Sequence, residues 1–184
     1  MVTMIYSKKR KTILLILIIS LNILFYSCIN KKNDSGVSQS RLDDNNKIPI
    51  YNFESLERLL YTQNKNIHII NFWAMWCAPC VKELPIIQEY EKNNPNVEVI
   101  LVSLDFPEDI ETKLMPFLND KGITSKVVLL DDPDANSWID KVNPNWSGAI
   151  PYTIIFNNEK RSFHERAFSS LIDLETEINS TFNN

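Results

Sequence analysis

Hydrophobic and polar positions divide the chain into three parts. Residues 8–11 are basic and residues 13–27 are almost entirely apolar, whereas residues 29–47 are polar with very few apolar side chains. From residue 48 onward, short apolar runs alternate with segments in which apolar residues have helical spacing. This pattern predicts a leader, a polar connector and one folded domain, for which the chain is long enough.

The folded part has a strand that leads directly into a helix. Residues 67–73 are a short apolar run rich in β-branched and aromatic side chains, as in a strand buried on both faces. Apolar residues then recur with helical spacing, which predicts a helix over residues 77–93 that Pro85 should kink. Residues 97–104 are a second apolar strand, so this unit predicts two parallel strands joined by a helix.

The rest of the pattern predicts further strands and helices, and hence an α/β fold. They are an edge strand at 48–51, a helix at 53–61 capped by Asn52, a helix at 107–120 ended by Gly122, a strand at 127–130, a short helix at 135–142, two hairpin strands at 152–156 and 161–164, and a last helix at 171–179 capped by Ser169 or Ser170.

Residues 1–27 have the layout of a secretory signal, with a basic start, an apolar stretch and Ser27 just before Cys28. About 15 apolar residues span roughly 22 Å as a helix, less than the ~30 Å hydrocarbon core of a membrane. Residues 24–28 resemble a bacterial lipoprotein processing site, which implies lipid on Cys28. An uncleaved transmembrane anchor or ordinary secretion are the alternatives, and each version sends the domain across the membrane because the basic flank stays inside.

The polar composition of residues 28–47 predicts a flexible tether that starts at the lipidated cysteine. About 20 such residues have a root-mean-square reach of roughly 25 Å, enough to hold a globular domain just clear of a membrane. The folded domain is therefore expected over residues 48–184.

Charge and composition exclude several functions. Removal of residues 1–27 takes away four basic and no acidic residues, which leaves 15 basic and 23 acidic groups, the wrong balance for a nucleic-acid partner. The three glycines form no Gly-rich loop after a strand, which argues against a phosphate-binding site. Two histidines are too few for a histidine-rich metal site, and we expect no metal and no cofactor besides a cysteine pair.

That pair, Cys77 and Cys80, lies where the buried strand passes into the first turn of the helix. Free backbone N–H groups and the helix dipole favour a thiolate there, and the thiolate is the attacking species in disulfide exchange. We expect Cys77 to be the nucleophile and Cys80, more buried and of higher pKa, to resolve the mixed disulfide. The alternative is a structural disulfide, although so small a loop restrains the unfolded chain little. Lipid on Cys28 would leave no odd thiol.

The residues around this pair resemble the thioredoxin superfamily, and more closely its membrane-tethered thiol–disulfide oxidoreductases of the TlpA/ResA type. The matching stretches are 71–74 (NFWA), 76–80 (WCAPC) and 83–85 (ELP). The resemblance covers about residue 50 to the C-terminus. It implies a thioredoxin-like fold, a central mixed sheet flanked by helices on both faces, with a TlpA/ResA-type insertion between the second central strand and a cis-proline loop.

The resemblance also implies roles for residues near the cysteines. Glu83 is expected near the active site, where it influences the proton chemistry of the cysteines; the alternative is a solvated charge on the helix surface. Asn71 stands where thioredoxins have a buried aspartate and cannot titrate, so that role is absent or belongs to Glu83. Pro79 makes the motif rigid and favours a reducing pair, and Trp76 is expected to line the substrate surface.

Residues 148–153 resemble the cis-proline loop of the superfamily. A cis Ile150–Pro151 bond would expose the backbone of Ile150 for pairing with a substrate strand. The alternative is an ordinary trans proline at the start of an edge strand.

The function expected from these residues is disulfide reduction in the bacterial envelope, by a periplasm-facing protein anchored through Cys28. Its partners would be protein disulfides, with apocytochrome c as one substrate class of the family, and a membrane thiol carrier that re-reduces the pair. One alternative is a copper-binding lipoprotein, which would need a downstream histidine near the cysteines, and His164 is predicted on a distal hairpin. The other is a non-catalytic adaptor that binds proteins by its cis-proline surface.

Overall fold

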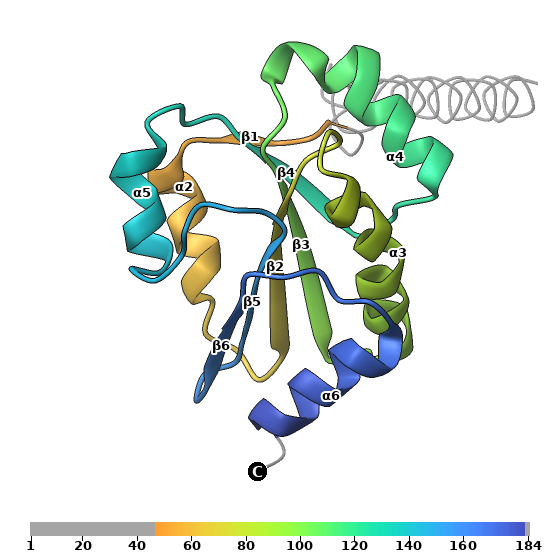
Figure 1. Ribbon diagram of the computed structural model, residues 1–184, viewed down its shortest axis with the longest axis vertical. Helices are drawn as coiled ribbons and strands as arrows, with labels where there is room; N and C mark the ends of the chain where they lie inside the picture. The colour runs from red at the N-terminus through yellow and green to blue at the C-terminus, as the bar shows by residue number, and fades with distance from the viewer. Residues whose placement is uncertain (1–46, 183–184) are drawn as a thin grey trace, which may run out of the picture. The chain divides into compact units, whose positions relative to one another are not determined.

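A computed structural model describes residues 47–182, in which six strands form one sheet in the order β1-β4-β3-β2-β5-β6 (Figure 1). The expected signal peptide at 1–27, the lipid on Cys28 and all of the tether except Lys47 lie outside these residues. Among residues 47–182, no helix has the length and apolar character needed to cross a membrane.

The sheet is mixed, as predicted. Parallel pairing joins β1 to β4, β4 to β3 and β3 to β2, whereas β2–β5 and β5–β6 are antiparallel. Strand β4 and the helices before it lie between β3 and Pro151, the segment where the insertion was expected. The strands are β1 (Ile50–Tyr51), β2 (Ile67–Trp73), β3 (Val97–Ser103), β4 (Lys126–Leu130), β5 (Tyr152–Phe156) and β6 (Arg161–His164).

Helices cover both faces of the sheet (Figure 1). The helical segments are α2 (Phe53–Glu57), η2 (Arg58–Tyr61), α3 (Ala78–Asn93), η3 (Pro107–Asp109), η4 (Ile110–Leu114), α4 (Met115–Lys121), α5 (Ala135–Val142) and α6 (Leu171–Phe182). Buried residues of α3, α4 and α6 share one core with Ile69 and Trp73, whereas α2 and α5 pack with Ile70 and Phe72 on the opposite face. Because side chains alternate along a strand, Asn71 of β2 points to the α3 face.

The helix predicted at 107–120 is instead three short segments: a 3₁₀ turn, a π-helical turn and α4. Pro116 explains the break, because it has no N–H to donate to the carbonyl four residues earlier. The amide of Met115 donates to the carbonyl of Ile110, five residues back, which widens the turn. The helix predicted at 53–61 likewise ends as the 3₁₀ segment η2, and α6 runs to Phe182 rather than 179.

Three predicted helix caps are confirmed. At the start of α2, Oδ1 of Asn52 accepts a hydrogen bond from the amide of Ser55 at 3.0 Å. Gly122 ends α4 in the left-handed conformation, at φ 63°, which glycine adopts without steric cost. At the start of α6, the hydroxyl of Ser170 accepts a hydrogen bond from the amide of Asp173 at 3.2 Å.

Candidate active site

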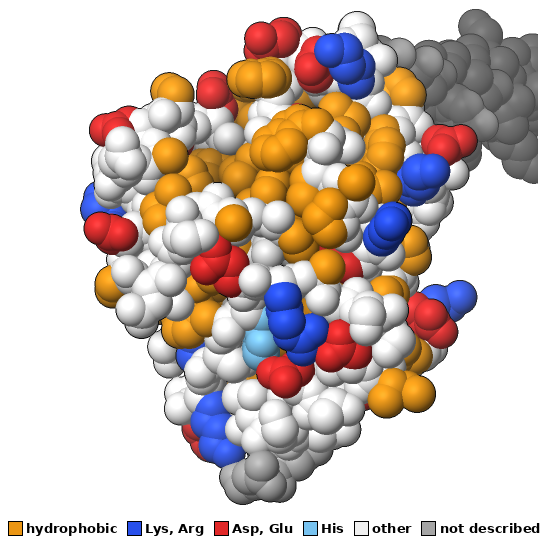
Figure 2. Space-filling model, viewed as in Figure 1, with side chains coloured by type: hydrophobic (Ala, Val, Ile, Leu, Met, Phe, Trp, Pro, Cys, Tyr) orange, Lys and Arg blue, Asp and Glu red, His pale blue; other side chains and the backbone are white. Residues whose placement is uncertain are grey.

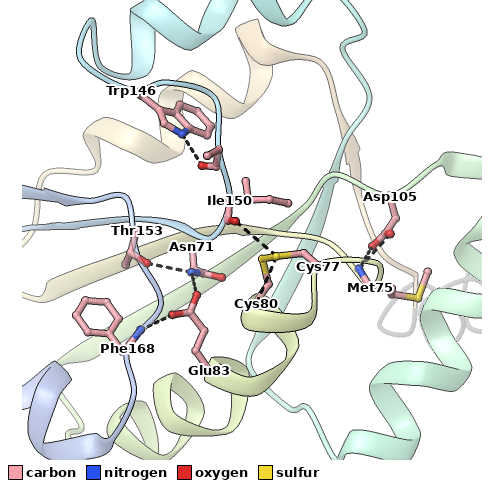
Figure 3. Close-up of a disulfide and its surroundings, with 11 residues drawn as sticks. Asn71, Met75, Cys77, Cys80, Glu83, Asp105, Trp146, Ile150, Thr153 and Phe168 are labelled. Atoms are coloured by element: carbon pink, nitrogen blue, oxygen red, sulfur yellow. Dashed lines mark hydrogen bonds between the residues drawn. A yellow bond between two sulfur atoms is a disulfide. The ribbon is translucent and has the colours of Figure 1, made fainter.

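A disulfide joins Cys77 and Cys80 at the N-terminus of α3 (Figure 3). Cys77 has extended backbone and is the N-cap, so α3 begins one residue later than predicted. Its Sγ accepts a hydrogen bond from the amide of Cys80 at 3.3 Å, which is the interaction that favours a thiolate at this position. Pro79 occupies the second helical position, where its missing N–H costs no helical hydrogen bond.

The two cysteines differ in access to solvent. The exposed fraction of Cys77 is 6%, whereas Cys80 is fully buried at 0%. An incoming disulfide can therefore reach Cys77 but not Cys80. This asymmetry fits the expected order of events, with Cys77 attacking first and Cys80 resolving.

The loop before β5 lies against the disulfide. The Ile150–Pro151 peptide bond is cis, as predicted, and the carbonyl oxygen of Ile150 lies 3.6 Å from Sγ of Cys77. Ile150 is half-buried. The indole N–H of Trp146 donates to the carbonyl of Ala149 at 2.8 Å, so this tryptophan holds the loop from inside the core.

Glu83 is fully buried, with an exposed fraction of 0%, so the alternative of a solvated surface charge is wrong. It lies one turn after Cys80 on the inner face of α3. Its Oε1 accepts from Nδ2 of Asn71 at 2.8 Å, and its Oε2 accepts from the amide of Phe168 at 2.8 Å (Figure 3). A carboxyl group in the core is thus bonded to two donors from distant parts of the chain.

Burial raises the pKa of Glu83 to about 7, from an ordinary value of 4.5. The hydrogen bonds from Phe168 and Asn71 and the positive charge of Arg166 oppose this rise, because each favours the ionised form. A carboxyl group with a pKa near neutrality can both accept and return a proton at physiological pH.

Asn71 connects Glu83 on α3 with Thr153 on β5. Its Nδ2 donates to Glu83 and, at 3.0 Å, to the hydroxyl of Thr153 on β5. Its Oδ1 is buried and has no hydrogen-bond partner within residues 47–182, and it points toward the disulfide (Figure 3). An unpaired buried acceptor is unusual, and here it is directed at the atoms whose protonation changes on reduction.

Asp105, which the sequence analysis did not single out, holds the loop before Cys77. Its carboxylate accepts from the amide of Met75 at 3.1 and 3.2 Å (Figure 3). It also accepts from the hydroxyl of Ser103 at 2.9 Å. Burial raises its pKa, against the effect of these hydrogen bonds. Its position just after a strand parallel to β2 was a usable signal, because the carboxyl ends of parallel strands meet at one edge.

Two exposed aromatic side chains flank this loop. Trp76 has an exposed fraction of 67%, as expected of a residue that lines a substrate surface, and Phe106, next to Asp105, has 62%. Figure 2 shows hydrophobic side chains gathered between α5 and α4 on the face of the molecule turned toward the viewer. Trp73 and Trp146 are instead buried in the two cores.

Each of the two histidines pairs with a glutamate. His68 is buried in β2 and pairs with Glu98, and His164 on β6 pairs with Glu177 at 3.2 Å. Within residues 47–182, no three histidine, cysteine or acidic side chains come together as metal ligands.

A mixed sheet with helices on both faces, a dithiol at a helix N-terminus and a facing cis-proline define a thioredoxin-like thiol–disulfide oxidoreductase. The chain belongs to the AhpC/TSA family, whose model matches residues 52–161.

Individual relatives agree with this class. The thiol-disulfide oxidoreductase ResA of Bacillus subtilis is 28% identical over 82% of this chain and 78% of its own. The thiol:disulfide interchange protein DsbE of Haemophilus influenzae is 30% identical over 68% of this chain and 70% of its own. Shorter matches span only 22% of ResA from Oceanobacillus iheyensis and 38% of sporulation thiol-disulfide oxidoreductase A from Bacillus subtilis.

A solved structure supports the fold alone. The DsbF homologue from Corynebacterium diphtheriae superposes with a TM-score of 0.52 at 23% identity, and the match covers 64% of this chain and 73% of that one.

Proposed function

We propose that this protein reduces disulfides in other proteins, with Cys77 as nucleophile, Cys80 as resolving cysteine and Glu83 as proton acceptor. The observation that carries the proposal is the asymmetry of the pair: Sγ of Cys77 sits at the helix N-terminus, whereas Cys80 is buried one turn before a carboxyl group with a pKa of about 7.

The reaction proceeds in two exchanges. The thiolate of Cys77 attacks a substrate disulfide, forms a mixed disulfide and releases one substrate thiolate. Cys80 then gives its proton to Glu83 and attacks Sγ of Cys77, which releases the second substrate thiolate. The substrate gains two electrons, the cysteine pair loses two and becomes the disulfide, and solvent and Glu83 supply protons to the released thiolates.

Substrate binding would use the surface around Cys77. The half-buried Ile150, next to the cis-proline, supports pairing of its backbone with an extended substrate segment. The exposed ring of Trp76 would pack against the same segment. Pro79 would keep the turn between the cysteines rigid.

We place this activity in the bacterial envelope, facing the periplasm. The support is the basic and apolar start of the chain and the lipoprotein-like residues before Cys28, which would carry the lipid anchor. A membrane thiol carrier would re-reduce the pair, the Cys77–Cys80 disulfide being the only redox group required. Apocytochrome c is one candidate substrate.

The test is to trap a substrate on single-cysteine variants. The pre-reduced protein should reduce insulin disulfides, Cys80→Ser should accumulate a mixed disulfide with the substrate, and Cys77→Ser should trap none. Trapping by Cys77→Ser instead, or no reduction by the wild-type protein, would overturn the assignment. The reduction potential of the pair then gives the direction, since a value well below that of glutathione defines a reductant.

A further inference from the structure

The amide of Phe168 belongs to a loop far from the cysteines in sequence, yet it bonds to Glu83. The loop, residues 165–170, joins β6 to α6, and Phe168 is almost fully buried. The 2.8 Å hydrogen bond from its amide to Oε2 is one of the two hydrogen bonds found on the Glu83 carboxyl group within residues 47–182. Because charge in the core needs donors, the position of this amide affects how readily Glu83 ionises.

An ion pair on the surface holds that loop. Arg166 binds Asp173 of α6 with two parallel bonds of 2.9 Å, and Asp173 also accepts from the amide of Ser169 at 2.9 Å. The carboxylate of Asp173 is therefore attached to the loop on both sides of Phe168. The guanidinium of Arg166 also lies 4.7 Å from the centre of the Phe168 ring, a third contact that holds Phe168 in place.

The charge of Arg166 favours the ionised form of Glu83, as the position of the Phe168 amide does. The pKa of Asp173 is lowered to about 2, chiefly by its hydrogen bond to Arg166, so the ion pair stays formed at any neutral pH.

The other groups around Glu83 have a smaller effect on its ionisation. Asn71 and Thr153, from β2 and β5, are neutral, and Lys82 on α3 is exposed to solvent. Glu177 of α6 lies 3.8 Å from Arg166 and pairs with His164 of β6. Its negative charge opposes the effect of Arg166 on Glu83, but the same contact helps to keep the Arg166 side chain in place.

We propose that Arg166 and Asp173 are positioning residues: their ion pair holds the Phe168 amide against Glu83 and so favours the ionised carboxylate that takes the proton of Cys80. The consequence for catalysis rests on the proposed function, whereas the effect on Glu83 itself does not.

The first experiment follows the carboxyl carbon of Glu83 by NMR during a pH titration of the disulfide form, which needs no substrate. Arg166→Gln should raise the titration midpoint by roughly one pH unit, a tenfold change in the ionisation equilibrium. Asp173→Asn loosens the loop but leaves the charge of Arg166 in place, so it should raise the midpoint by less. Hydrogen exchange at the Phe168 amide should become faster in both. Arg166→Lys, which keeps the charge without the two-pronged geometry, should restore only part of the wild-type midpoint.

The matched control is Lys113→Gln, which breaks the exposed Lys113–Asp109 pair on another surface and should leave the midpoint and the exchange unchanged. A midpoint that stays at the wild-type value in both Arg166→Gln and Asp173→Asn would overturn the proposal. The pH profile of mixed-disulfide resolution should move with the midpoint. A shifted midpoint without any disulfide reduction would refute the proposed function and leave the positioning role intact.

Discussion

Replacement of Glu83 by glutamine should change how the stability of the protein depends on pH. The folded protein holds a proton on Glu83 up to a pKa of about 7, whereas the ordinary value is 4.5. Between these values the folded state binds more protons than the unfolded state, so stability must fall as pH rises through this window. The contribution is fully present below 4.5 and fully lost above about 7.

The size of the effect follows from the same two values. A difference of about 2.5 in pKa, at about 1.4 kcal/mol for each unit, makes ionised Glu83 cost roughly 3 kcal/mol of unfolding free energy above neutrality. Glutamine never ionises and escapes this loss. It does present an N–H₂ group to one of two donors, Asn71 or Phe168, and this mismatch costs about 1–2 kcal/mol at every pH.

The assay is urea unfolding of the disulfide form between about pH 4 and about pH 9, because the cysteines do not titrate in that form. The unfolding free energy of Glu83→Gln minus that of the wild type should increase by roughly 3 kcal/mol across the range. Other shifted groups, such as Asp105, are present in both proteins and cancel in the difference. Glu89→Gln, at an exposed position of the same helix, should run parallel to the wild type. A Glu83→Gln curve that also runs parallel would refute the reasoning.

Three further predictions concern residues around the site. Asp105→Ala should lower the unfolding free energy in urea by about 1–3 kcal/mol because the Met75 amide loses its acceptor, and Asp105→Asn should lose less; equal stability of the alanine variant would contradict this role. Phe106→Ala should raise KM for a protein disulfide about fivefold with little change in kcat, whereas Ile172→Ala, an exposed apolar residue on α6, should change neither. Ser170→Ala should destabilise the protein by about 1 kcal/mol in the same urea assay, through loss of the α6 cap.

The strand, the helix and the dithiol were predictable because their determinants are local. The apolar run, the cysteine pair and the helical spacing all fall within residues 67–93, and the structure has them within one residue of the predicted bounds. The predicted single helix at 107–120 is wrong for an equally local reason, since Pro116 interrupts the backbone hydrogen bonds within the apolar spacing. Periodicity reports which face is buried, but it does not report a missing backbone donor.

The burial of Glu83 was left open by the sequence because its immediate neighbours give opposite signals. Lys82 and Pro85 are exposed, whereas Leu84 and Ile87 are buried, so Glu83 lies at the edge of the apolar stripe of α3. A surface position and a core position both fit that spacing. The choice between them depends on tertiary contacts that local periodicity does not contain.

One of those contacts was within reach of sequence reasoning. Alternation along β2 places Asn71 on the same face as Ile69 and Trp73, and a buried amide on an apolar face needs a polar partner. The facing helix offers Glu83, one turn beyond Cys80. The Phe168 donor carries no such signal, because it is a backbone amide and lies 85 residues away. The motif residues therefore predict the reaction, whereas the pH at which Glu83 can take a proton depends on a loop that the motif does not include.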